Sequence, residues 1–86
     1  MLEFEVTVQN RTGLHARPAA KLVELAERYK SDVILLVGDK ALNAKSILSV
    51  LSGGISSGMQ ITLRLDGSDE REAMEAVKDY FKNLPD

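Results

Sequence analysis

Two stretches of the chain carry hydrophobic residues at every second position. Residues 2–8 and 59–66 alternate in this way, a period typical of strands with one buried face. Residues 33–37 form a hydrophobic run of strand length, expected as a central strand. The Gly38-Asp39 pair suits a hairpin turn into a short edge strand over 40–44. The alternating residues expected to face the core are Leu2, Phe4, Val6, Val8, Ile61, Leu63 and Leu65.

Three other stretches have the spacing of helices. Hydrophobic residues recur every three or four positions in residues 16–29 and 69–84, which predicts helices with one face on the core. Residues 47–52 follow Ser46, a favoured N-cap residue, and stop at a Gly-Gly pair, which predicts a short helix. The spacing of Asp69 and Glu72 predicts a capping box at the start of the last helix.

These elements give the order β-α-β-β-α-β-α and an α+β fold. Strands with one hydrophobic face predict an antiparallel sheet with helices packed on one side and water on the other. A chain of 86 residues is long enough for one modest core. We therefore expect a single domain over residues 1–86.

Composition narrows the possible functions. The chain has no Cys and one His, which excludes disulfides, Cys-based zinc sites and multi-histidine metal sites, so no metal or cofactor is expected. A net charge of −2 and the lack of Trp argue against direct nucleic-acid binding. The N-terminus does not resemble a signal peptide, and the longest hydrophobic run is too short to cross a bilayer. These features predict a cytoplasmic protein without membrane insertion.

The only histidine, His15, lies where an extended segment gives way to a helix. Pro18 fits the first helical position or one close to it, because proline has a helical φ and lacks an N–H that a first-turn residue does not use. This places Ala16 or Arg17 near the N-cap and His15 just outside the helix, beside its free N–H groups. No Ser, Thr, Asp or Asn occupies positions 14–17, so the N–H groups at the helix start are left for an anion.

This arrangement suits phosphoryl transfer. A neutral nitrogen of His15 can accept a phosphoryl group as a nucleophile. The Arg17 guanidinium and the backbone N–H groups of Ala16 and Arg17 would stabilise the added charge. The alternative from the residues alone is an ordinary surface or capping histidine.

The stretch Gly13-Leu14-His15-Ala16-Arg17-Pro18-Ala19 closely resembles the active-site motif of the HPr family. These proteins are the histidine-containing phosphocarriers of the bacterial phosphoenolpyruvate-dependent sugar phosphotransferase system. The element order also matches the family's open-faced β-sandwich, with a four-stranded antiparallel sheet and three helices on one face. The resemblance implies that His15 accepts a phosphoryl group from enzyme I and passes it to the IIA component of a sugar permease. The chain would then be a carrier rather than an enzyme, and a monomer is the simplest expectation.

A second stretch, Ser46-Ile47-Leu48 with the glycine-rich connector to Ile61, resembles the other signature region of HPr. The resemblance implies that an HPr kinase/phosphorylase modifies Ser46 with ATP. The modified protein would stop carrying phosphoryl groups and act with a catabolite-control transcription regulator. A phosphate at a helix N-terminus is expected to stabilise that helix. The alternative is that Ser46 is only an N-cap.

The helix over 47–52 is too short to bury all its hydrophobic residues, so some of them are expected on a partner-docking surface. The alternative is that all of them pack inward. The expected docking residues are Ala20, Ile47, Leu48 and Leu51, with a basic rim from Arg17 and Lys45.

Other functions also fit the sequence. They are an HPr-like regulatory protein of the nitrogen branch, a co-repressor-type module that acts by binding, and a small binding domain without phosphoryl chemistry. The presence of His15 argues against regulatory relatives that have lost the carrier function, because these lack the histidine.

Overall fold

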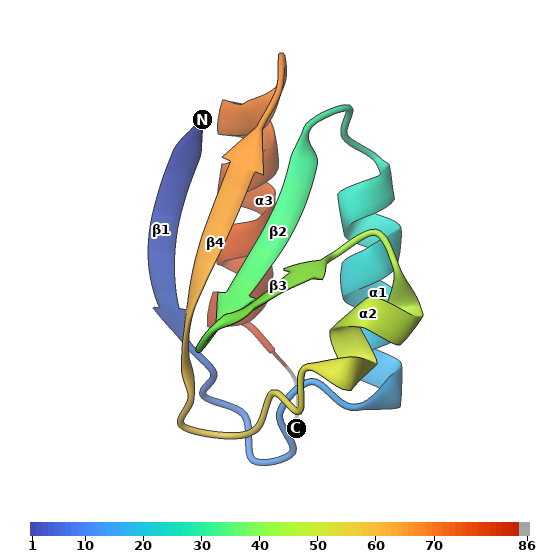
Figure 1. Cartoon of the computed structure of the whole chain (residues 1–86), viewed down its shortest axis with the longest axis vertical. Helices are drawn as coiled ribbons and strands as arrows, with labels where there is room; N and C mark the ends of the chain where they lie inside the picture. Colours follow the sequence, from blue (N-terminus) through green and yellow to red (C-terminus); the bar gives the residue numbers. More distant parts are fainter. Residues whose placement is uncertain (85–86) are drawn as a thin grey trace.

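The computed structural model describes residues 1–84, which form a four-stranded antiparallel sheet and three helices (Figure 1). The predicted α+β fold and its element order are confirmed. The elements are β1 (Leu2–Thr7), α1 (Ala16–Glu27), β2 (Asp32–Val37), β3 (Lys40–Asn43), α2 (Ile47–Ser52), β4 (Gln60–Asp66) and α3 (Glu70–Lys82).

The strands lie in the order β1-β4-β2-β3, so β2 is central and β3 is an edge strand, as predicted. Leu63 of β4 pairs with Phe4 of β1 on one side and with Leu35 of β2 on the other. Strands β2 and β3 are joined by a two-residue turn that starts at Gly38, whose φ is 60°. This left-handed backbone favours glycine, which explains the residue at this turn.

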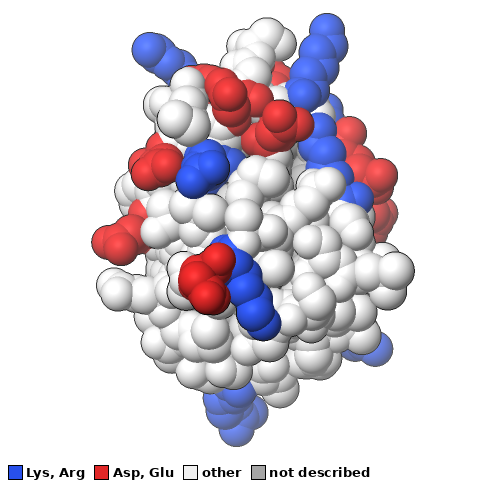
Figure 2. Space-filling model, viewed as in Figure 1, with Lys and Arg blue, Asp and Glu red and all other residues white. Residues whose placement is uncertain are grey.

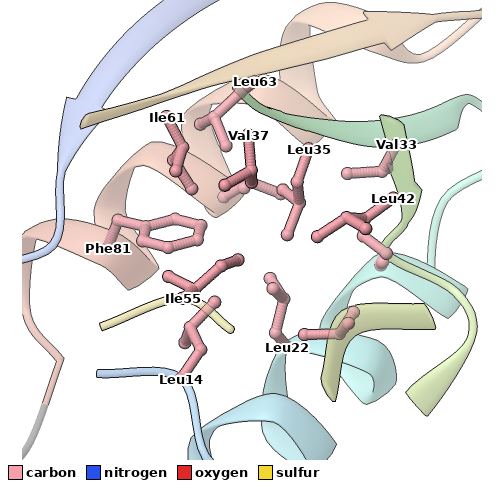
Figure 3. Packing of buried hydrophobic residues seen from close by; sticks show 14 of the residues in the cluster. Leu14, Leu22, Val33, Leu35, Val37, Leu42, Ile55, Ile61, Leu63 and Phe81 are labelled. Atoms are coloured by element: carbon pink, nitrogen blue, oxygen red, sulfur yellow. The ribbon is translucent and has the colours of Figure 1, made fainter. Parts of the chain in front are cut away.

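The helices cover one face of the sheet and enclose the core. Figure 1 looks onto the strands, with α3 behind them. In Figure 2, the same view, charged side chains gather towards the upper end and most of the lower part is uncharged. Figure 3 shows side chains from the strands, α1, α3 and two loops meeting in the core. The largest fully buried hydrophobic residues are Phe81, Leu22, Leu35, Ile61, Leu63, Leu65, Val8, Val33, Val50 and Val77.

Among the predicted core residues of β1, Leu2 and Val6 are only half-buried and Phe4 is exposed. Phe4 is 44% exposed, although its register places it on the helix-facing side of β1. Strand β1 is the other edge strand of the sheet, so the Phe4 ring has a neighbouring strand on one side only. The ammonium of Lys78 on α3 lies 4.3 Å from the ring centroid and covers part of it.

The predicted capping box at the start of α3 is wrong. Asp69 is the N-cap residue, but its side chain makes no capping hydrogen bond. Its carboxylate instead accepts hydrogen bonds from the Ser31 hydroxyl and from the backbone N–H groups of Lys30 and Ser31. These bonds, that of the Ser31 hydroxyl above all, lower the pKa of Asp69 from 3.8 to about 2. The residue therefore ties α3 to the turn between α1 and β2.

Candidate functional site at the start of helix α1

His15 is the N-cap residue of α1. Its backbone is extended (φ −91°, ψ −161°), and its exposed side chain makes no capping hydrogen bond. Ala16 and Arg17 are the first two helical residues, so the prediction that they lie near the N-cap, with His15 just outside the helix, is confirmed. Pro18 is the third helical residue rather than the first, and it fits there because the first four N–H groups of a helix have no partner within it.

The start of α1 offers unpaired donors next to His15. The first helical hydrogen bond runs from Ala19 N to His15 O at 2.9 Å. No group among residues 1–84 accepts a hydrogen bond from the amides of Ala16 and Arg17, and the first turn contains no acidic residue. The exposed Arg17 side chain makes no ion pair within the same part of the chain. Two amides and a guanidinium are thus available to an anion.

The loop before His15 is held by buried contacts that the sequence did not reveal. Asn10, only 4% exposed, donates from Nδ2 to Gly13 O at 3.0 Å. The backbone N–H of Leu14 donates to Ile55 O at 3.0 Å. The side chains of Leu14 and Ile55 both point into the core (Figure 3). An Asn three residues before a glycine is a common turn signal, and it was the only hint of this role.

Ser46 is the N-cap residue of α2, as predicted. Its hydroxyl accepts a hydrogen bond from the Ser49 N–H at 3.2 Å. The Ser49 hydroxyl in turn accepts one from the Asn43 N–H at 2.9 Å, which joins α2 to the end of β3. The short helix is therefore stabilised at its start by side-chain bonds as well as by packing.

Helix α2 lies against α1 (Figure 1), and it presents part of its hydrophobic surface to solvent. Leu48 is 78% exposed and Leu51 is 41% exposed, whereas Val50 is buried. Ile47 is half-buried, and Ala20 on α1 is exposed. The expectation that some hydrophobic residues of α2 remain exposed is confirmed.

The proposed basic rim is smaller than predicted. Lys45 does not project freely, because its ammonium donates to Tyr29 O at 2.8 Å, just beyond the end of α1. A cation at this position interacts favourably with the negative end of the helix dipole. Lys45 therefore fastens the end of α1, and Arg17 is left as the cation of this rim.

Two other kinds of site are missing from residues 1–84. They contain no group of three or more His, Cys, Asp or Glu side chains placed to hold a metal ion. None of the helices in this part of the chain is long and apolar enough to cross a membrane.

Comparison with known proteins identifies the family. Residues 2–83 match the family model described as the PTS HPr component phosphorylation site. Phosphocarrier protein HPr of Xylella fastidiosa (strain Temecula1) is 45% identical over 83 residues, which cover 96% of this chain and 93% of that protein. The HPr-like protein Crh of Bacillus subtilis is also 45% identical, over 95% of this chain and 96% of that protein.

Solved structures agree. HPr from Thermoanaerobacter tengcongensis has a TM-score of 0.92 and 40% identity, over 95% of this chain and 92% of that chain. A dimer of HPr from the same organism and a swapped dimer of Bacillus subtilis Crh are also similar, with TM-scores of 0.76 and 0.77. The sequence match over nearly the whole chain and the shared fold lead to one conclusion. The chain belongs to the HPr family of phosphocarrier proteins.

Proposed function

We propose that His15 accepts a phosphoryl group from phosphorylated enzyme I and passes it to the IIA component of a sugar permease. The observation that carries this proposal is the exposed imidazole at the start of α1, beside two amides that have no partner in residues 1–84. A lone pair of a ring nitrogen, Nδ1 by family resemblance, forms a bond to phosphorus as the bond from phosphorus to enzyme I breaks. The second transfer repeats this exchange with IIA as the acceptor.

Both transfers need a histidine that two different proteins can reach in line with phosphorus. An exposed N-cap residue satisfies this requirement. The Arg17 guanidinium and the amides of Ala16 and Arg17 stabilise charge on the phosphoryl oxygens during transfer. Residues Ala20, Ile47, Leu48 and Leu51 form the surface on which the partners dock.

The test is incubation with enzyme I and labelled phosphoenolpyruvate. The wild-type protein should acquire acid-labile label, and His15→Ala should acquire none. Arg17→Ala should be labelled about a hundredfold more slowly, the typical effect of removing one charge-stabilising donor. Lys21→Ala, an exposed cation one turn further along α1, is the matched control and should keep a near wild-type rate. Absence of label on the wild type, or label that survives His15→Ala, would overturn the proposal.

Regulation through Ser46 is the second part of the proposal. A phosphate on Ser46 would retain the capping interaction at the start of α2 and place about two negative charges beside exposed Leu48. It would thus repel acidic partners without unfolding the helix. With HPr kinase and labelled ATP, the wild type should be labelled and Ser46→Ala should not. The phosphorylated protein should then accept the phosphoryl group from enzyme I more slowly, and an unchanged rate would contradict this regulation.

A binding-only regulatory role is the second candidate, favoured by the similarity to the HPr-like protein Crh. In that case the chain would bind a transcription regulator of catabolite control and His15 would carry no phosphoryl group. The labelling experiment with enzyme I separates the two roles. We expect the protein to act in the cytoplasm as a monomer, and sedimentation would distinguish this from the dimers seen for its relatives.

A further inference from the structure

The peptide group between Gly13 and Leu14 is held from both sides. Its carbonyl oxygen accepts the hydrogen bond from Asn10 Nδ2 at 3.0 Å. Its N–H, which belongs to Leu14, donates to Ile55 O at 3.0 Å. A peptide group is planar, so two bonds on opposite edges fix its orientation. This fixed plane lies one residue before His15.

The surroundings leave this segment little freedom. Asn10 and Leu14 are 4% and 3% exposed. Gly13 has a φ of 67°, and a Cβ atom there would lie 2.5 Å from Ile55 O, so the loop packs directly on the backbone of 55–56. Figure 3 shows Leu14 and Ile55 close together in the core. The backbone that leads into His15 is thus immobilised although the imidazole itself is exposed.

We propose that Asn10 is a positioning residue for His15. Its side-chain amide fixes the Gly13–Leu14 peptide and thereby the direction in which the imidazole leaves the start of α1. Asn10 acts through the backbone and does not touch the phosphoryl group. This inference rests on the proposed carrier function of His15, because in-line transfer between two proteins depends on the orientation of the accepting nitrogen.

The test uses two variants of Asn10 and a control at the other end of the molecule. Asn10→Asp keeps the shape, but its carboxylate cannot donate to Gly13 O; Asn10→Ala removes the side chain. Asp69→Asn weakens the contact with Ser31 at the opposite end of α1, away from the loop (Figure 1). Both Asn10 variants should shift the NMR resonances of the Leu14 amide and of the His15 ring. They should also slow transfer from enzyme I by about tenfold or more, since a misplacement of ~1 Å can cost a hundredfold.

The control should show unchanged His15 resonances and an unchanged transfer rate even though its unfolding midpoint falls. If the Asn10 variants also leave the His15 resonances and the transfer rate unchanged, as Asp69→Asn should, the proposal is wrong. Should Asn10→Ala fail to fold, the isosteric Asn10→Asp decides. The ring resonances need no phosphoryl donor, so they test Asn10 independently of carrier function. A wild type without label would refute the carrier function, whereas a labelled wild type with unshifted resonances in the variants would refute the role of Asn10.

Discussion

Asp69 illustrates how one side chain can join distant parts of the chain. Its carboxylate accepts three hydrogen bonds from Lys30 and Ser31, which precede β2, while its own backbone starts α3. Because these bonds favour the charged form, they lower the pKa of Asp69 to about 2 in the folded protein, from its ordinary value of 3.8. The stabilisation is therefore fully present above pH 3.8 and is lost as the pH falls through 2.

We expect Asp69→Asn to have a lower free energy of unfolding than the wild type at pH 7. We also expect this free energy to decrease less in the variant than in the wild type as the pH falls from 3.8 to 2. Urea denaturation at several pH values measures both effects. Asp39→Asn removes the same charge in the exposed β2–β3 turn and serves as the control. An equal pH dependence in the wild type and Asp69→Asn would show that the contact does not stabilise the fold.

Tyr80 provides a similar link between helices, because its hydroxyl donates to Pro18 O at 2.7 Å. Tyr80→Phe removes only this bond and should lower the free energy of unfolding by about 1 kcal/mol. Thermal denaturation measures the loss. Tyr29→Phe is a matched control, since no bond of its hydroxyl is found among residues 1–84. A stability of Tyr80→Phe equal to that of the wild type would argue against the link.

Among the elements, β1, β4, α1 and α3 were predictable because each has a clear hydrophobic period and lies against one core; β2, β3 and α2 were predictable from a hydrophobic run, a turn and a cap. Leu63 and Leu65 in β4 and Val77 in α3 are buried as their spacing requires. The contacts that join elements were not predictable in this way. Lys45 reaches Tyr29 and Asp69 reaches Ser31 only after the sheet brings these residues together, and nothing in the local sequence encodes that distance.

The candidate site likewise has features that the sequence predicted and features that it did not. The exposed His15, next to amides without a partner among residues 1–84, follows from the local sequence, since no Ser, Thr, Asp or Asn occupies positions 14–17. The sequence located the N-cap only to within a residue or two, because Pro18 is compatible with several places in the first turn. The role of Asn10 depends on its burial under the loop, which its neighbours in the sequence do not indicate.

The loop before α1 gives a prediction at the scale of one element. Gly13→Ala forces an L side chain into a left-handed backbone and against Ile55 O, so we expect a loss of more than about 2 kcal/mol. Gly38→Ala has a similar φ of 60° but meets nothing within 4 Å, so it should lose only about 1 kcal/mol. Chemical denaturation of the two variants measures the difference. Equal losses would mean that the close approach of the two loops is unimportant.

At the scale of the whole molecule, the docking role proposed for α2 can be tested separately from the contribution of α2 to folding. Leu48 is 78% exposed, so Leu48→Ala should change stability by no more than about 0.5 kcal/mol. The same variant should weaken binding to enzyme I by about tenfold, as expected for a hydrophobic residue in an interface. Isothermal titration calorimetry measures this affinity.

Val50 on the same helix should behave in the opposite way. Because Val50 is fully buried, Val50→Ala should lower the free energy of unfolding by about 2 kcal/mol and leave the affinity of the folded protein unchanged. If Leu48→Ala binds enzyme I as tightly as the wild type, α2 does not form the docking surface.

The start of α1 lacks a capping side chain, and this lowers the stability of the protein. A Ser or Asp in place of His15 would bond to an amide that has no partner in the described part of the chain, and it should raise the free energy of unfolding by about 1 kcal/mol. Such a variant would have a higher melting temperature but could not accept a phosphoryl group at position 15. Attempts to make this protein more heat-resistant should therefore leave position 15 alone and turn to residues far from it.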